Sequence, residues 1–268
     1  MRHVVITGGS RGIGFGLVRE FLLRGLNVTF CGTTDHSVMK AMNLLTEEWS
    51  SKKFRGVVCD VSKEDDLLNL WEFGTKIFGE VDIWINNAGI DNPQATFNKL
   101  QPSVINRLID INIKGLIHAS HIAYNNMLKQ GKGSIYNMGG LGSDGRMIKG
   151  LTPYGMSKRA VQYFTKAFAR ETGKESPVII GLLLPGMVLT DMLLDPIRKG
   201  EDNARRLKRV YNLLAEEVEP VASYLADRIT SNEKNGAIIS YSGSTRMFLK
   251  IPGRLFSGRD IVSDKLEA

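Results

Sequence analysis

Tyr154 and Lys158 are the residues whose types and spacing point most directly to chemistry. They stand four positions apart, so on a helix both side chains project from one face. A tyrosine, with a pKa of about 10, is a poor acid–base partner near neutrality unless its anion is stabilised, and an ammonium group one turn away supplies that stabilisation. Such a pair is common on any helix and by itself would be read as structural. Together with the glycine-rich loop and the Asn-Asn-Ala-Gly motif described below, it predicts proton transfer to or from a carbonyl or alcohol oxygen, with Tyr154 as the proton donor.

A glycine-rich loop is the second chemical signal. Residues 7–14 read TGGSRGIG and stand directly between a predicted strand and a predicted helix. Glycines allow a tight turn and a close approach of the backbone to a pyrophosphate, and a helix N-terminus offers free N–H groups to that anion. The loop therefore predicts a dinucleotide site. Its expected contacts are Gly8, Ser10, Arg11, Gly12, Ile13 and Gly14.

The end of the second predicted strand favours NADP(H) over NAD(H). A carboxylate at that position would bind the ribose hydroxyls of NAD, but the sequence has Gly32 there, followed by Thr33. Arg11, inside the glycine-rich loop, is placed to meet a 2′-phosphate. Asp35 comes about a turn later and is expected to cap the next helix.

The elements that must position these residues alternate along the chain. β-branched runs predict strands, and longer runs with helical spacing predict helices. Strands are expected at 3–7, 27–31, 54–59, 81–85, 133–138, 178–184 and 236–241, and helices at 12–24, 36–49, 63–78, 102–127 and 153–172. Because the strands are almost continuously apolar, the pattern predicts an α/β protein with a single doubly wound parallel sheet, the Rossmann fold, and helices on both faces.

Two segments depart from this alternation. Residues 189–214, called here the lid segment, hold no predicted strand and carry a basic helical stretch that is either a solvated surface helix or a substrate lid. Residues 246–268 form a basic amphipathic tail, which would dock on the chain's own core, on a partner subunit or on a membrane surface. We expect residues 1–245 to form one reductase domain that includes the lid segment.

Composition excludes several classes of protein. The chain has 268 residues, 43% of them hydrophobic and 24% charged, with a net charge of +7 that is too diffuse to predict nucleic-acid binding. Cys31 and Cys59, the two cysteines, lie in apolar runs and are expected to be buried reduced thiols. His118 and His121 stand three apart without further ligand-spaced residues, so no metal site is expected. We expect a cytoplasmic protein, or a membrane-peripheral one if the tail binds a membrane.

Several motifs in order give the chain a resemblance to the short-chain dehydrogenase/reductases. They are the glycine-rich loop, Asp60-Val61, Asn86-Asn87-Ala88-Gly89, Asn112, Tyr154-Gly155-Met156-Ser157-Lys158 and Pro185-Gly186, and the match runs over residues 3–245. The resemblance implies cofactor contacts from Asp60, Val61, Asn86, Ala88, Gly89, Pro185, Gly186, Val188 and Thr190. It also implies that Tyr154 and Lys158 touch the cofactor, with Lys158 on the nicotinamide ribose.

For Asn112, the resemblance implies a bend in its helix around a water that links Lys158 to solvent. It further implies a homodimer or homotetramer, for which the helices 102–127 and 153–172 would be available.

Within that family, Asp82–Gly89, Tyr136–Met138 and Pro185–Asp191 look like the chlorophyll b reductases, which reduce a ring formyl group to a hydroxymethyl group. The family's usual serine pair after the fifth strand is replaced here by Gly139 and Gly140. Ser143 remains, and it is either the residue that orients the substrate oxygen or a plain loop serine. In the second case the two glycines make room for a bulky substrate.

The sequence thus predicts an NADP(H)-dependent oxidoreductase that reduces a carbonyl, preferably a large apolar aldehyde such as the formyl group of chlorophyll b. The predicted catalytic residues are Ser143, Tyr154, Lys158 and Asn112. The alternatives are a reductase of a steroid, acyl or sugar ketone, and a cofactor-binding regulatory protein without turnover.

Overall fold

The computed structural model describes residues 1–200, 204–241, 254 and 260–267. In that part of the chain the strands are β1 (His3–Ile6), β2 (Asn27–Gly32), β3 (Phe54–Val58), β4 (Ile83–Asn86), β5 (Gly133–Met138), β6 (Val178–Leu184) and β7 (Ala237–Ser240). The helices are α1 (Gly12–Leu23), α2 (Asp35–Thr46), α3 (Glu64–Phe78), α4 (Pro102–Ile109), α5 (Leu116–Gln130), α6 (Thr152–Thr172), α7 (Asp191–Arg198), α8 (Ala204–Leu214), α9 (Val218–Thr230) and α11 (Ile261–Glu267).

The strands form one parallel sheet in the order β3-β2-β1-β4-β5-β6-β7. The order reverses between β1 and β4, and ligands of such sheets bind in the crevice at the carboxyl ends of the strands beside this reversal. The loops that follow β1, β4, β5 and β6 carry many of the predicted site residues. Others follow β2 and β3 or lie on helical segments, among them Thr33, Asp60, Val61, Asn112, Tyr154 and Lys158. The sheet confirms the predicted doubly wound fold.

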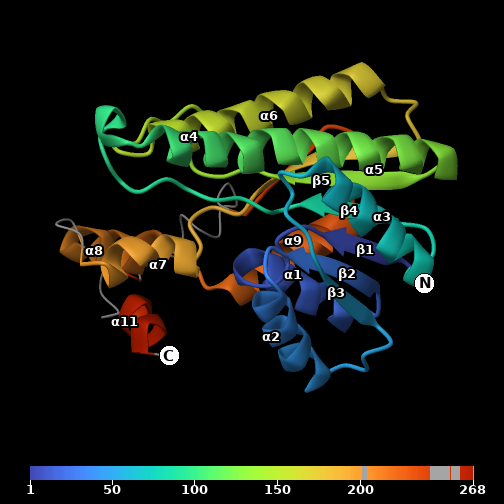
Figure 1. Cartoon of the computed structure of the whole chain (residues 1–268), viewed down its shortest axis with the longest axis horizontal. Helices are drawn as coiled ribbons and strands as arrows, with labels where there is room; N and C mark the ends of the chain where they lie inside the picture. The colour runs from blue at the N-terminus through green and yellow to red at the C-terminus, as the bar shows by residue number, and fades with distance from the viewer. Residues whose placement is uncertain (201–203, 242–253, 255–259, 268) are drawn as a thin grey trace.

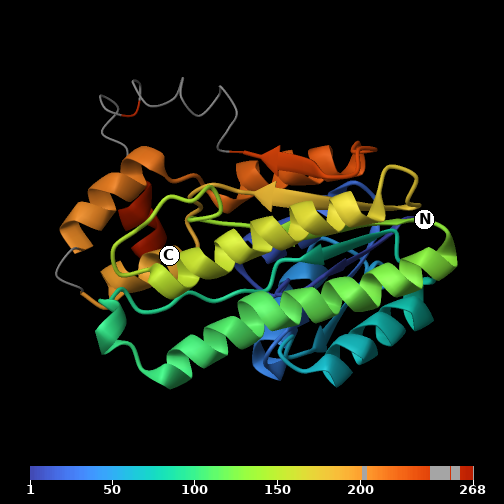
Figure 2. The ribbon, with the colours of Figure 1, turned by 90° about the horizontal axis from the view of Figure 1, so that it is seen from above.

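Side chains of successive strand residues alternate between two apolar cores. Val4 and Ile6 of β1 pack with α1, α2 and α9 on one face, while Val5 packs with α3, α5 and α6 on the other. Figures 1 and 2 show α5 and α6 lying side by side over one face of the sheet, with α1 and α2 beneath the other. Both faces of the central strands are therefore buried, as their continuous apolar sequences predict.

The helix expected over 102–127 departs from a regular α-helix. It is divided into α4 and α5 by a π-helical segment, Asp110–Gly115, which contains Asn112. A π-helical turn widens the helix by one residue and exposes backbone groups to new partners, and such turns are frequent at functional sites. Helical periodicity alone did not indicate this widening.

The lid segment contributes α7 and α8, and α11 packs beside them at one end of the molecule (Figure 1). Of the predicted tail, Arg254 and residues 260–267 belong to the described chain. The tail residues 246–253, 255–259 and 268 lie outside it. The described part of the chain holds no helix that is long and apolar enough to cross a membrane.

Candidate active site

The glycine-rich loop passes from the carboxyl end of β1 into the first turn of α1. Gly8 and Gly12 have φ values of 63° and 57°, which side-chain-bearing residues rarely adopt. A Cβ on Gly8 would lie 2.9 Å from the Cα of Ala88, so the loop and the end of β4 fit together only with glycine there. Arg11 precedes α1 without a side-chain cap to the described residues, which leaves the N–H groups of the first turn available to an anion.

The other loop residues shape this cradle. Ile13 and Gly14 form the first turn of α1, and Gly14 is buried against the loop because a Cβ there would meet the side chain of Asn87 at 2.5 Å. A pyrophosphate would lie where the backbone comes close to it without intervening side chains. The loop therefore fits the phosphates of a dinucleotide.

Hydroxyl groups line the end of β2. A Cβ on Gly32 would lie 2.7 Å from the Oγ of Ser10 and 2.9 Å from that of Ser37. Thr33, the next residue, is exposed, and so is Arg11 in the glycine-rich loop. This set of donors fits a phosphate better than the paired hydroxyls of an unmodified ribose.

The cap of α2 differs from the sequence prediction. Thr34 is the N-cap, and its Oγ1 accepts a hydrogen bond of 3.2 Å from the N–H of Ser37. Asp35, predicted as the cap, is the first residue inside the helix, where its charge still favours the positive end of the dipole.

Asp60 and Val61 follow β3 at the predicted adenine side of the crevice. Burial raises the pKa of Asp60, but hydrogen bonds from Ser62 and Arg107 outweigh it, so the pKa lies below its ordinary value and the carboxylate stays charged. The Asp60 carboxylate accepts bonds of 2.7 Å from the Ser62 hydroxyl and 3.1 Å from Arg107. Val61 is buried against the π-helical segment, since a Cβ on Gly115 would meet its carbonyl oxygen at 2.6 Å.

The side-chain amide of Asn86 is hydrogen-bonded inside the protein. Its Oδ1 accepts a bond of 2.7 Å from the Trp84 indole, and its Nδ2 donates to Ser120 at 2.9 Å and to Asn137 at 2.8 Å. The amide therefore joins β4, β5 and α5 inside the protein, and the cofactor contact of Asn86 stays a prediction. Ala88, two residues later, donates from its N–H a bond of 3.1 Å to the Oγ1 of Thr7.

Asn112 binds the loop after β4 from the π-helical segment. Its Oδ1 accepts a bond of 2.8 Å from the N–H of Ile90, and its Nδ2 donates to the carbonyl of Ile90 at 2.7 Å and to Ser157 Oγ at 3.1 Å. Gly89 fills the gap between this side chain and Lys158, because a Cβ there would lie 3.3 Å from Asn112 Oδ1 and 3.4 Å from Lys158 Nζ. The structure thus brings Asn112, Gly89 and Lys158 together.

Tyr154 and Lys158 meet on the first turns of α6. The Lys158 ammonium lies 5.8 Å from the centroid of the Tyr154 ring and donates a bond of 3.1 Å to the carbonyl of Met138 at the end of β5. Burial lowers the pKa of Lys158 to about 8. Burial also raises the pKa of Tyr154, and the negative charge of Asp91 raises it further. Near neutrality the phenol therefore holds its proton, the form needed to protonate an oxygen.

The hydroxyl of Ser143 both accepts and donates a hydrogen bond within the protein. The Oγ accepts a bond of 3.0 Å from the N–H of Gly140 and donates one of 3.1 Å to the carbonyl of Lys158. Gly140 is the residue that faces the acid, because a Cβ there would lie 2.8 Å from the Tyr154 hydroxyl. The space beside the phenol is thus opened by a glycine, and the Ser143 hydroxyl is bonded within its own loop.

The loop after β6 closes the remaining side of the crevice. Pro185 is followed by Gly186, whose φ is 80°. Val188 forms an isolated parallel bridge with Glu216. Thr190 meets the glycine-rich loop, since a Cβ on Gly12 would lie 3.3 Å from its Cγ2. The phosphate loop and the predicted nicotinamide loop therefore face one another.

Sequence analysis missed the role of Asn92. α6 follows Leu151, which has no side-chain acceptor, and the Oδ1 of Asn92 accepts a bond of 3.1 Å from the N–H of Tyr154. The Nδ2 of Asn92 donates to the carbonyl of Gly150 at 2.9 Å. The signal in the sequence was that the helix carrying Tyr154 begins without a capping residue of its own.

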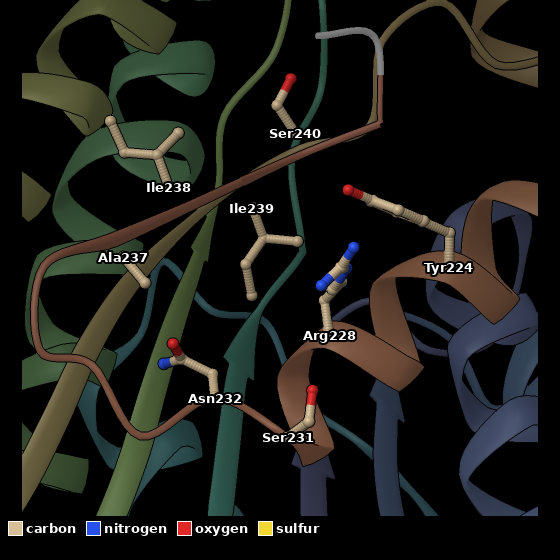
Figure 3. Close-up of a pocket in the computed structure, with 8 residues that line it drawn as sticks. All are labelled: Tyr224, Arg228, Ser231, Asn232, Ala237, Ile238, Ile239 and Ser240. Atoms are coloured by element: carbon tan, nitrogen blue, oxygen red, sulfur yellow. The ribbon is translucent and has the colours of Figure 1, made fainter. Parts of the chain in front are cut away.

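A separate hollow of about 460 Å³ lies at the edge of the sheet and is shown in Figure 3. It is lined by α9 and β7 residues, among them Tyr224, Arg228 and Ser240, and by none of the predicted site residues. Cys31 and Cys59 are both buried, and the described residues contain no group of three or more His, Cys, Asp or Glu side chains that could hold a metal.

Comparison with known proteins places these features in context. Residues 2–200 match the family model for short chain dehydrogenases. The chain is 34% identical over 266 residues to chlorophyll(ide) b reductase NOL of Arabidopsis thaliana, covering 96% of this chain and 74% of that protein. A probable chlorophyll(ide) b reductase of Oryza sativa subsp. japonica is 33% identical over 266 residues, which cover 93% of this chain and 51% of that longer protein.

The fold is shared with solved structures. An actinorhodin polyketide ketoreductase with NADPH superimposes with a TM-score of 0.80 at 22% sequence identity, over 90% of this chain and 95% of that one.

Proposed function

Because the chain belongs to the short-chain dehydrogenase family and is an oxidoreductase, we propose that it reduces a carbonyl group to an alcohol with NADPH. The single observation that carries this proposal is the meeting of Tyr154, Lys158 and Asn112 at the carboxyl end of β5, opposite the glycine-rich loop. Tyr154 and Lys158 lie one turn apart on α6, whereas Asn112 comes from the π-helical segment, far earlier in the sequence. Their convergence gives a buried acid next to a dinucleotide cradle.

Residues present in the chain fit the cofactor. The backbone of Gly8–Gly12 would hold the pyrophosphate, and the hydroxyls and guanidinium of Ser10, Arg11 and Thr33 support a 2′-phosphate and hence NADP(H). On the adenine side Asp60 and Val61 would be in contact, and Gly186 and Thr190 would approach the nicotinamide. When bound, the reduced nicotinamide supplies the hydride for the carbonyl carbon.

The chain's own residues would supply and replace the proton. Tyr154 donates its phenolic proton to the substrate oxygen as the carbonyl is reduced, and the ammonium of Lys158 stabilises the phenolate that is left. Lys158 would also hold the nicotinamide ribose. The π-helical place of Asn112 supports its role in holding a water path by which the phenolate regains a proton from solvent.

For Ser143, the hydrogen bonds favour the second of the two interpretations. Its hydroxyl already serves Gly140 and the carbonyl of Lys158, so we propose that it positions the loop that faces Tyr154. Tyr154 would then be the side-chain donor to the substrate oxygen.

We propose a large apolar aldehyde of the chlorophyll b type as the preferred substrate. The support is twofold: the likeness to chlorophyll(ide) b reductases, and the glycine at position 140, which leaves space against the Tyr154 hydroxyl. The segment 141–156, which leads from β5 into the first turns of α6, also exposes Leu141, Met147 and Met156, and these apolar side chains suit an apolar ring system.

NADPH oxidation measures this proposal directly. Purified protein would be assayed with chlorophyllide b, a steroid ketone, an acyl ketone and a small sugar ketone, with the hydroxymethyl product identified by mass. We expect turnover of the formyl substrate, and a fall of roughly 10²–10⁴-fold in kcat for Tyr154→Phe, because only the proton donor is lost. NADPH affinity should stay unchanged in that variant.

The outcomes separate the alternatives. Turnover of only the steroid or acyl ketone would refute the aldehyde as the preferred substrate but would still support the reductase activity. NADPH binding without turnover of any substrate would favour the regulatory alternative. A Tyr154→Phe variant with nearly normal kcat would refute the acid assignment.

A further inference from the structure

The C-terminal helix is anchored to the lid segment. Val262 of α11 is completely buried in an apolar cluster with Leu189, Leu194 and Tyr211. The side chain of Asn212 also binds this end of the chain, donating to Asp260 at 2.9 Å and accepting from the N–H of Val262 at 3.1 Å. These contacts join residues more than 45 positions apart, so the end of the chain is part of the lid.

A buried ion pair makes a second connection. Arg254 Nη2 lies 2.5 Å from Glu216 Oε1, and the two side chains are only 9% and 6% exposed. Arg254 also donates a bond of 3.2 Å to the carbonyl of Leu213, at the end of α8. Burying such a pair costs desolvation that its attraction only partly offsets, so a buried pair is better explained by the geometry it imposes than by stability.

Glu216 lies directly against the loop after β6. Its N–H donates to the carbonyl of Met187 at 3.0 Å, and its carbonyl accepts from the N–H of Leu189 at 2.8 Å. These two bonds clamp Val188 between them. The same loop reaches the glycine-rich loop through Thr190, as described above. Contacts therefore run without a break from Arg254 through Glu216 to the cofactor crevice.

We propose that the Arg254–Glu216 pair positions the nicotinamide-side loop, so that the C-terminal segment sets the affinity for NADPH. The inference rests on the proposed function in one respect, that residues 186–190 contact the cofactor. The lid cluster is separate from the two cores beside the sheet, so the clamp on residues 187–189 is a principal link between the lid and the sheet. With the pair broken, the backbone bonds of Glu216 lose their support and the loop samples positions that do not hold the cofactor.

A double-mutant cycle on the full chain tests the positioning role. The variants are Arg254→Met, Glu216→Gln and the two combined, with Arg254→Lys as the conservative substitution. The readouts are the dissociation constant of NADPH from protein fluorescence, the KM and kcat of the reductase assay, and the thermal midpoint. Arg198→Met is the matched control, because it removes an ion pair with Asp191 from the exposed surface of α7.

Each single substitution should raise the NADPH dissociation constant by about tenfold, the size of a typical coupling between two sites, and Arg254→Lys should restore most of it. The double variant should bind better than the sum of the singles predicts, because it leaves no unpaired buried charge. Arg198→Met should change the affinity by less than about twofold.

The inference would be overturned if the single variants lowered the thermal midpoint but kept the wild-type affinity and KM. If Glu216→Gln failed to fold, the two Arg254 substitutions would still decide the question. Wild-type protein that did not bind NADPH would instead refute the proposed function. Wild-type binding with equal binding by all variants would refute only the positioning role.

Discussion

Burial has opposite effects on the two central groups of the candidate site. It raises the pKa of Tyr154 and lowers that of Lys158 to about 8, because a low-dielectric surrounding disfavours the charged form of each. Near neutrality the phenol is therefore protonated while the lysine still carries its charge for most of the time. The phenol thus holds the proton that a carbonyl oxygen would need, while its raised pKa makes it a weaker acid than an ordinary tyrosine.

Substitutions at Ser143 and Gly140 should have contrasting effects. Ser143→Ala removes a hydroxyl that bonds within its loop, so we expect kcat to fall less than about tenfold, whereas loss of a direct donor to the substrate oxygen costs about 10²–10³. The variant should lose about 1–3 kcal/mol of unfolding free energy, because the N–H of Gly140 and the carbonyl of Lys158 lose a partner.

Gly140→Ala is the matched substitution on the other side of the phenol. Its backbone accepts a side chain because Gly140 has no positive φ, but the new methyl group would crowd the Tyr154 hydroxyl at 2.8 Å. We expect kcat/KM to fall by about 10² with NADPH affinity retained. Steady-state kinetics and cofactor titration measure both variants, and a 10³-fold loss in Ser143→Ala would restore the serine as the substrate's donor.

The strands and helices position the site mainly through the residues at their ends. β1, β4, β5 and β6 finish at one edge of the sheet, so loops separated by many residues meet there. α6 carries Tyr154 in its first turn and depends on a residue of the β4 loop for its cap. Asn112 of the π-helical segment is hydrogen-bonded to Ile90 of the same loop. Helix α6 and the π-helical segment are therefore both hydrogen-bonded to the loop after β4.

Asn92 should control the start of α6. We expect Asn92→Ala to lower the unfolding free energy by about 1–2 kcal/mol and to reduce kcat, because Tyr154 loses the acceptor for its N–H. Asn92→Asp keeps an acceptor oxygen and adds a favourable charge at the helix N-terminus, so it should retain more activity. Denaturant unfolding and kcat measurements compare the two. Equal activity in wild type and Asn92→Ala would contradict the capping role.

At the scale of the whole molecule, stability depends on a buried imidazole at the start of the central strand. His3 is fully buried, its Nε2 lies 2.9 Å from the Thr29 hydroxyl, and its ring contacts Phe78 edge to face. Burial lowers the pKa of His3 from 6.5 to about 4, although carbonyls of Gly79 and Glu80 and the charge of Asp82 oppose this change. The folded protein thus holds His3 neutral where the unfolded chain protonates it.

Acid should therefore destabilise the protein over a defined range. As the pH falls from 6.5 toward 4 the unfolded state takes up the proton first, so the unfolding free energy falls by roughly 3 kcal/mol through His3 alone. The contribution is fully present above pH 6.5. Denaturant unfolding at several pH values measures the slope, and His3→Gln should flatten it across that window. Parallel slopes in the two proteins would contradict the assignment.

Much of the fold and part of the site follow from local sequence. The predicted strands agree with the structure within a few residues, because burial on both faces leaves a continuous apolar run in each strand, and so do the predicted helices other than 102–127. Sequence also identified the glycine-rich loop and the pairing of Tyr154 with Lys158, since both depend on residues within one or two turns of each other.

The remaining features depend on contacts between distant segments. Periodicity did not distinguish a π-helical turn at Asn112 from a regular helix, and spacing from Tyr154 did not indicate that the Ser143 hydroxyl would bond to Gly140 and to the carbonyl of Lys158. Asn86 matched a motif, yet Trp84, Ser120 and Asn137 take up its amide.

Short-range spacing was thus sufficient for the fold class, the glycine-rich loop and the Tyr154–Lys158 pair, because the signals for them lie within single elements or at their ends. The cap of α6 by Asn92, the open space beside Tyr154 and the connection from Arg254 to the loop after β6 were decided by packing. The contacting pairs Asn92 and Tyr154, Gly140 and Tyr154, and Glu216 and Arg254 are 62, 14 and 38 positions apart, and only the folded chain brings such residues within hydrogen-bonding distance or van der Waals contact.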